Sequence, residues 1–220
     1  MSRFVHVRRA LPLAALCAAA CTGSLFHSKA APPTVYLLSA GQASPRDGAP
    51  APGTPAAEIP VDLTVLKPKA RAGLESDRIA VLYPDRRLDY FADARWSGPL
   101  GEVLQELAVQ EFHLHANLRT VSGDASVFAS AYWLEIEITD FQAEYTSAAT
   151  APTVRVSLRA RLGSSGDRHL VGQFAATVQK PAAENRLSSI VDAFAGAADA
   201  SLAEIAAQAG EKLARVSETR

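Results

Sequence analysis

Alternating apolar and polar residues predict the strands of this chain. From Glu58 to Leu66 every second residue is apolar, which is typical of a half-buried strand, and Pro60 suggests either a sheet edge or an outward-facing start of the strand. Residues 153–162 alternate in the same way, with arginines on the polar phase. Segments 132–139 and 169–179 also alternate, the second with Leu170 as the first residue of its inward-facing phase, and short polar stretches connect the three. These three segments therefore predict an antiparallel meander.

Shorter patterns predict the remaining strands and one irregularity. The apolar phase shifts by one residue at Thr139–Asp140, which is the signature of a β-bulge. Runs 78–83 and 88–91 flank a turn that begins with proline, so they predict a hairpin. Segments 34–38 and 117–121 contain β-branched residues and complete the set of expected strands.

A period of 3.6 residues predicts two helices. Residues 100–112 repeat apolar side chains at i, i+3, i+4 and i+7, and we expect Ser97 or Gly98 to cap this helix with Pro99 in its first turn. Residues 187–215 repeat the pattern with many alanines. The strands on either side of the first helix could form a right-handed parallel crossover. The expected fold class is α/β of the α+β type: a single mixed, largely antiparallel sheet with two amphipathic helices packed on it.

The N-terminal segment has the features of an export signal. Arg3, Arg8 and Arg9 precede an apolar run from Ala10 to Ala20, and no acidic residue occurs in this part of the chain. A helix of this length is about 16 Å long, roughly half of a ~30 Å hydrocarbon core, so it is too short to span a membrane. We expect residues 1–20 to be a lipoprotein signal peptide.

The end of this signal resembles a bacterial lipobox. Small residues precede Cys21, which would be diacylated, become the first residue after cleavage and then be acylated on its amine. Cys17 is the weaker candidate because the bulky Leu16 stands directly before it. The alternative is an ordinary signal cleaved near Ala20, which would leave Cys21 as a free thiol. We predict lipidation of Cys21.

Two further segments are expected to lack regular structure. Residues 21–33 end in two prolines and predict a lipidated tether that reaches at most about 40 Å. Residues 39–57 are rich in proline and glycine and predict a mobile loop. The folded domain is expected to comprise residues 34–220.

Composition narrows the classes of function. The chain after residue 20 has 19 basic and 23 acidic residues, a net charge of −4, which excludes a nucleic-acid binder by charge. Both cysteines fall in the signal or at the acylation site, so the folded part offers no disulfide, thiolate metal site or cysteine nucleophile. No nucleotide-binding glycine loop, nucleophile elbow or zinc-protease motif occurs. We expect no enzyme activity and no cofactor.

Two clusters of chemically active residues have ordinary interpretations. His113 and His115 are two residues apart at a helix end, so their rings should point to different faces and not share a metal ion. Glu135 and Glu137 share one face of a strand and are expected to form a solvated face rather than a catalytic carboxylate pair.

The remaining candidates are residues for partner contact. Arg155, Arg159 and Arg161 form a basic row on the neighbouring strand, where they could be cross-strand partners of the glutamates or could bind a lipid headgroup or a partner protein. Trp133 falls on the polar phase of its strand, which is a hint of an interface. Trp96 is expected in the core. We take Trp133, Arg155 and Arg159 as candidate partner-binding residues.

The order of these features resembles that of the ABC-type transport auxiliary lipoproteins, the PqiC-like family. The resemblance covers nearly the whole chain after the signal and departs from the pattern in the long loop 39–57. It implies a non-enzymatic partner of an MCE-type ABC lipid transporter. The segments that carry it are the lipobox, Tyr36-Leu37-Leu38, Ile59 to Leu63, Asp77 to Val81, Trp96 to Leu100, Tyr132 to Ile136 and the alanine-rich last helix.

The expected function follows from the resemblance. It is that of an outer-membrane-anchored lipoprotein that faces the periplasm, docks an MCE-domain protein of a phospholipid transport system and supports membrane integrity. Thr22 rather than an aspartate follows the acylated cysteine, which by resemblance to known sorting signals favours the outer membrane. A homo-oligomer is left open. The alternative is a stand-alone lipid- or lipopolysaccharide-binding lipoprotein of the periplasm, which would need an apolar cavity between helices and sheet.

Overall fold

The computed structural model describes residues 32–41, 58–124, 126, 129–147 and 150–218. The chain divides into two units, Met1–Pro32 and Pro33–Arg220, and the account below concerns the second. The expected signal peptide, Cys21, most of the tether and most of loop 39–57 lie outside the described residues.

The second unit contains one sheet of nine strands and two helices. The strands are β1 (Thr34–Tyr36), β2 (Ile59–Val65), β3 (Lys69–Ala70), β4 (Arg78–Leu82), β5 (Leu88–Trp96), β6 (Leu118–Gly123), β7 (Tyr132–Glu144), β8 (Thr153–Ser164) and β9 (Leu170–Pro181). The helices are α1 (Leu100–His115) and α2 (Leu187–Glu218). The expected α+β fold class is therefore confirmed.

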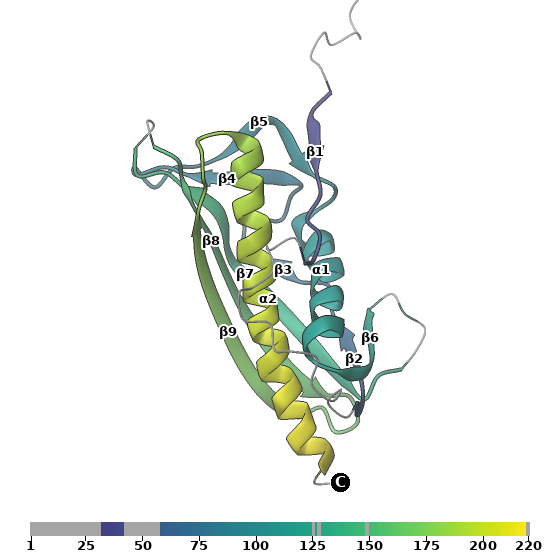
Figure 1. Ribbon diagram of the computed structural model, residues 1–220. Coiled ribbons are helices and arrows are strands. Elements are labelled where there is room, and N and C mark those ends of the chain that lie inside the picture. The colour runs from purple at the N-terminus through teal and green to yellow at the C-terminus, as the bar shows by residue number, and fades with distance from the viewer. Residues whose placement is uncertain (1–31, 42–57, 125, 127–128, 148–149, 219–220) are drawn as a thin grey trace, which may run out of the picture. The chain divides into compact units, whose positions relative to one another are not determined.

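Strand β7 organises the sheet (Figure 1). Along one side it pairs antiparallel with β8, which pairs antiparallel with β9, so the meander is confirmed. Along its other side it pairs in parallel with three shorter strands, β2, β3 and β4. The register between β7 and β8 shifts between Ile138 and Asp140, where the bulge was expected. Strands β4 and β5 form the expected hairpin.

Two sequence-based expectations about the strands are wrong, and one is met by its alternative. The strands on either side of α1 do not form a parallel crossover, because β5 runs antiparallel to β4, whereas β4, β7, β2 and β6 run parallel to one another. Strand β2 is an inner strand between β6 and β7, and Pro60 is exposed at its second residue, which is the outward-facing start rather than the edge. Pro60 is tolerated because the register is irregular between Ile59 and Asp62. Leu170 is 48% exposed rather than buried, because the register between β8 and β9 shifts at Gly163.

The start of α1 also differs from the prediction. Pro99 is the N-cap residue, and no side chain caps the helix, so neither Ser97 nor Gly98 has that role. The backbone N–H of Leu100 instead donates to the carbonyl oxygen of Ser76 at 3.1 Å. A backbone acceptor from another segment therefore replaces the expected side-chain cap.

Both helices cover the same face of the sheet (Figure 1), with α2 packed over β8 and β9 and α1 packed beside it near β2 and β6. Their shared core includes an aromatic cluster of Trp96, Phe141 and Phe194, each at most 1% exposed. The ring centroids of these residues lie 5.0–5.9 Å apart. Trp96 is thus a core residue, as expected, and the cluster ties β5, β7 and α2 together. The other face of the meander carries the polar phase of its strands.

Candidate functional site

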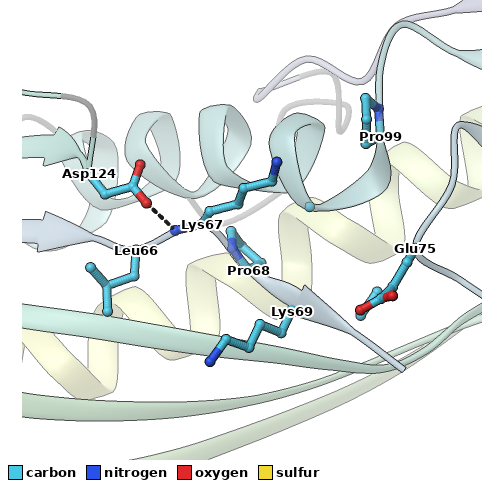
Figure 2. Close-up of a pocket in the computed structure, with 9 residues that line it drawn as sticks. Leu66, Lys67, Pro68, Lys69, Glu75, Pro99 and Asp124 are labelled. Carbon is cyan, nitrogen blue, oxygen red and sulfur yellow. Dashed lines mark hydrogen bonds between the residues drawn. The ribbon is translucent and has the colours of Figure 1, made fainter. Parts of the chain in front are cut away.

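A groove opens where the chain leaves β2 and where α1 begins (Figure 2). Its volume is about 560 Å³. The connection from β2 to β3, the first turn of α1 and the residue that follows β6 all contribute to its walls. The lining residues are Leu66, Lys67, Pro68, Lys69, Ala70, Glu75, Pro99, Gly101 and Asp124.

Close backbone packing forms the floor of the groove. A Cβ atom at Gly101 would lie 2.5 Å from the carbonyl oxygen of Pro68, well inside van der Waals contact. Glycine at this position therefore allows the first turn of α1 to approach the connection between β2 and β3. The groove is a consequence of how two backbone segments meet rather than of a missing side chain.

Both lysines of the groove wall form ion pairs with acidic residues beside the groove. The Nζ atom of Lys67 lies 2.6 Å from Oε1 of Glu102, and that of Lys69 lies 3.1 Å from Oε1 of Glu135. Asp124 accepts hydrogen bonds from the side chain of Gln105 at 2.9 Å and from the backbone N–H of Lys67 at 3.2 Å. Figure 2 shows Asp124 turned toward the Lys67 nitrogen. Both lysines in the wall are thus engaged by the chain's own acids.

The same contacts set the protonation state of Asp124. The Gln105 amide, and after it the Lys67 N–H, stabilise the carboxylate and hold the pKa of Asp124 below its usual value of 3.8. Because the pKa of Asp124 is lower in the folded than in the unfolded state, its carboxylate stabilises the fold above about pH 4. This stabilisation is lost as the pH falls through the folded-state pKa. At neutral pH the groove therefore keeps its internal pairing.

The predicted partner-binding residues lie elsewhere, on the open face of the meander that the helices do not cover. Arg155 donates to Glu144 at 2.8 Å and is not free. Arg159 is exposed and stands directly across from Glu137 in the register of β7 and β8. Arg159 and Glu137 line a second, shallow hollow of about 480 Å³. Of the expected cross-strand ion pairs, Arg161 with Glu135 is formed at 3.0 Å.

Trp133 has a structural role on this face. It stands across from Gly163 on β8, and a Cβ atom at Gly163 would lie 2.0 Å from Cζ2 of Trp133. The indole ring therefore covers the glycine, which leaves Trp133 only half-buried. Trp133, Arg155 and Arg159 all lie on the open face. Trp133 stands across from Gly163 near the end of β8, however, whereas Arg155 lies near the start of that strand.

Replacing Gly163 by alanine is expected to destabilise the domain by about 1–3 kcal/mol, because the new methyl group would overlap the indole ring. The free energy of unfolding in urea measures this effect. In a Trp133→Ala background the same substitution should cost much less, because the overlapping ring is absent. An equal cost in both backgrounds would show that the ring does not need glycine beneath it.

The two histidines near the end of α1 have different surroundings. His115 lies 3.2 Å from the carboxylate of the buried Glu111, and both histidines are exposed. No group of three or more histidine, cysteine, aspartate or glutamate side chains that could hold a metal ion occurs within the described residues.

The groove has no signature in the sequence. The chain is basic from Lys67 to Arg71, but the acidic partners Glu102, Asp124 and Glu135 come from three other segments. Only the pairing of β3 with β7 and the position of α1 bring these groups together.

Neither α1 nor α2, the helices of the described part of the chain, is long and apolar enough to cross a membrane.

Comparisons with known proteins agree with this fold. The family model of the ABC-type transport auxiliary lipoprotein component matches residues 36–206. The crystal structure of protein XCC0632 from Xanthomonas campestris is similar with a TM-score of 0.68 and 22% identity, over 84% of this chain and 99% of that chain. Protein CT253 from Chlamydia trachomatis matches with a TM-score of 0.50 and 10% identity, over 70% of this chain and 99% of that chain. The search of curated proteins gives no match.

Proposed function

Because the chain belongs to the family of ABC-type transport auxiliary lipoprotein components, we propose that it is the outer-membrane lipoprotein of an MCE-type ABC lipid transport system. The observation that carries the proposal is the family match, which spans residues 36–206 and so includes every strand of the meander and both helices up to the last turns of α2. In this role the folded domain binds a transporter subunit and carries out no catalytic step.

Three features of the chain support this role. Lipidation of Cys21 would hold the domain at a membrane, and the tether of residues 21–33 would keep it within about 40 Å of that membrane. The open face of the meander presents Arg159 beside Glu137, without an ion pair between them in the described structure, on a rigid antiparallel sheet. A rigid surface with exposed charge of both signs suits recognition of a protein partner. Phospholipid is then the cargo of the transporter.

A photo-crosslinking amino acid at position 159 tests the proposal. In cells that carry the transport system, this position is expected to capture the MCE-domain subunit, because Arg159 is exposed on the open face. The same probe at Glu204, which is exposed on α2 over the other face, is the matched control and should capture less.

The possible results separate two claims. Capture from position 204 but not from position 159 would retain the transporter partner and move its contact surface to the helical side. Failure of probes on both faces to capture a transporter subunit, while the protein remains in the membrane, would overturn the proposed function.

The stand-alone lipid-binding function has less support. It needs an apolar cavity between helices and sheet, but Trp96, Phe141 and Phe194 occupy the centre of that interface in mutual contact. Native mass spectrometry of the intact protein measures this directly. Co-purified lipid beyond the N-terminal acyl chains would favour the stand-alone function.

A further inference from the structure

Exposed apolar side chains gather where the folded domain begins. Val35 in β1 is 54% exposed, and Leu37, which follows this strand, is 71% exposed. Among the residues that the structure describes, the only other exposed large apolar side chains are those of Leu114 and Leu170. Half of this set therefore lies within three consecutive residues, close behind the expected tether.

The backbone of this segment turns both side chains away from the core. Tyr36 and Leu38 pack against the core, and Val35 and Leu37 alternate with them and face outward. In the parallel pairing of β1 with β5, Tyr36 lies across from the buried Trp96. Figure 1 shows β1 at the edge of the sheet beside β5. Packing of the described domain therefore leaves the two aliphatic side chains without cover.

Arginine and tyrosine side chains border the exposed apolar residues. Arg95 stands across from Val35 in the register of β1 and β5, and Arg78 stands across from Arg95 in that of β4 and β5. Paired residues of neighbouring strands project from the same face, so both exposed arginines lie on the side of Val35. The Arg78 guanidinium lies 3.8 Å from the ring centroid of Tyr90, and Arg95 lies 3.5 Å from the carboxylate of Asp77. Aliphatic side chains beside arginine and tyrosine suit a lipid–water interface, where the apolar groups enter and the polar ends stay among the headgroups.

The position of this surface in the chain favours lipid as its occupant. Val35 follows Cys21 by 14 residues, so acylation of Cys21 would hold β1 close to a bilayer. Two aliphatic side chains are too few to hold a free protein at a membrane, but the anchor makes their contact with lipid intramolecular and so raises the effective concentration. A protein strand has little to pair with here, because β1 contains three residues.

We propose that Val35 and Leu37 insert into the surface of the bilayer that holds the acylated Cys21, so that β1 makes a second contact with phospholipid. Arg95 and Arg78 then lie at the depth of the phosphate groups, which accept hydrogen bonds from guanidinium groups. This contact fixes which side of the domain faces the membrane. The inference rests on the lipid anchor of the proposed function and is independent of the transporter partner.

Three single-cysteine variants of the lipidated protein, V35C, L37C and T34C, test the contact. In the lipidated chain Cys17 is removed with the signal and Cys21 is acylated, so the introduced cysteine alone accepts a nitrobenzoxadiazole label. The labelled proteins are placed in vesicles of phosphatidylethanolamine and phosphatidylglycerol that contain a spin-labelled phospholipid as quencher. Quenching at positions 35 and 37 is expected to be about twofold or more stronger than at position 34.

Thr34 is the matched control. It is exposed and one residue nearer to Cys21 than Val35 is, but it lies across from the buried Ala94, on the other face of β1. Proximity to the anchor alone therefore predicts at least as much quenching at position 34 as at positions 35 and 37. The label is the same in all three variants, so its own affinity for lipid does not produce a difference between them.

The outcomes separate this contact from the anchor and from a protein occupant. Stronger quenching at positions 35 and 37 than at position 34 supports the inference. Equal quenching at all three positions, in protein that floats with the vesicles, would overturn it and leave the lipid anchor in place. Labels at 35 and 37 that neither the lipid quencher nor aqueous iodide reaches would assign the surface to protein and also overturn it. Protein that does not float would overturn both the inference and the anchor, and circular dichroism checks that each variant folds.

Discussion

Replacing Cys21 by alanine is expected to release the protein from the membrane. Three acyl chains, at about 0.8 kcal/mol for each buried CH₂ group, hold a protein far more firmly than one chain, which binds only marginally. No helix in the described part of the chain is long and apolar enough to cross a membrane. Fractionation of cells into membrane and soluble periplasmic material, followed by quantification of the protein, measures the change.

The chain supplies its own control for this substitution. Cys17 lies four residues before Cys21 in the same apolar segment, but the bulky Leu16 stands before it. Cys17→Ala should therefore leave the protein in the membrane fraction. If the Cys21 variant stayed in the membrane and the Cys17 variant did not, the acylation site would be Cys17. Separation of inner and outer membranes would then test the proposed location.

Replacing Phe194 by alanine is expected to lower the free energy of unfolding by about 3–5 kcal/mol, a large part of the stability of a domain of this size. Phe194 is fully buried and packs against both Trp96 and Phe141, at centroid distances of 5.3 and 5.0 Å. The lost ring would leave a cavity bounded by strands β5 and β7, which cannot collapse without moving the sheet. Urea unfolding followed by circular dichroism measures the effect.

Leu114→Ala is the matched control for the core substitution. Leu114 is also a large apolar residue of a helix, but its side chain is 64% exposed. Its removal should change the free energy of unfolding by less than about 0.5 kcal/mol. A similar loss in both variants would mean that the aromatic cluster does not hold α2 on the sheet.

Local periodicity was sufficient to predict the elements of the meander. In β8 the buried residues Val154, Val156, Leu158, Ala160 and Leu162 alternate with polar ones, and the register with β7 follows. The bulge near Asp140 was also readable, because an extra residue changes the apolar phase of a single strand. These features depend on the pleat of one strand or on its neighbour in sequence.

Long-range pairing was not readable in the same way. The parallel contacts of β7 with β2, β3 and β4 join segments whose sequences carry no sign of their partner. The cap of α1 was mispredicted for the same reason, because the acceptor for Leu100 is the backbone of Ser76. Every residue has a backbone carbonyl, so no sequence pattern predicts which carbonyl will accept the hydrogen bond from a helix start.

For the candidate sites, too, the sequence identified residues but not the partners that these residues contact. The sequence by itself determined the fold class, the meander and the family, and it singled out Cys21, Trp133, Arg155 and Arg159. Tertiary structure alone decided that Trp133 covers Gly163, that Arg155 is held by Glu144, and that the lysines of the groove pair with acids from distant segments. The reason is physical: periodicity reports which face of an element is buried, whereas partners depend on which elements become neighbours.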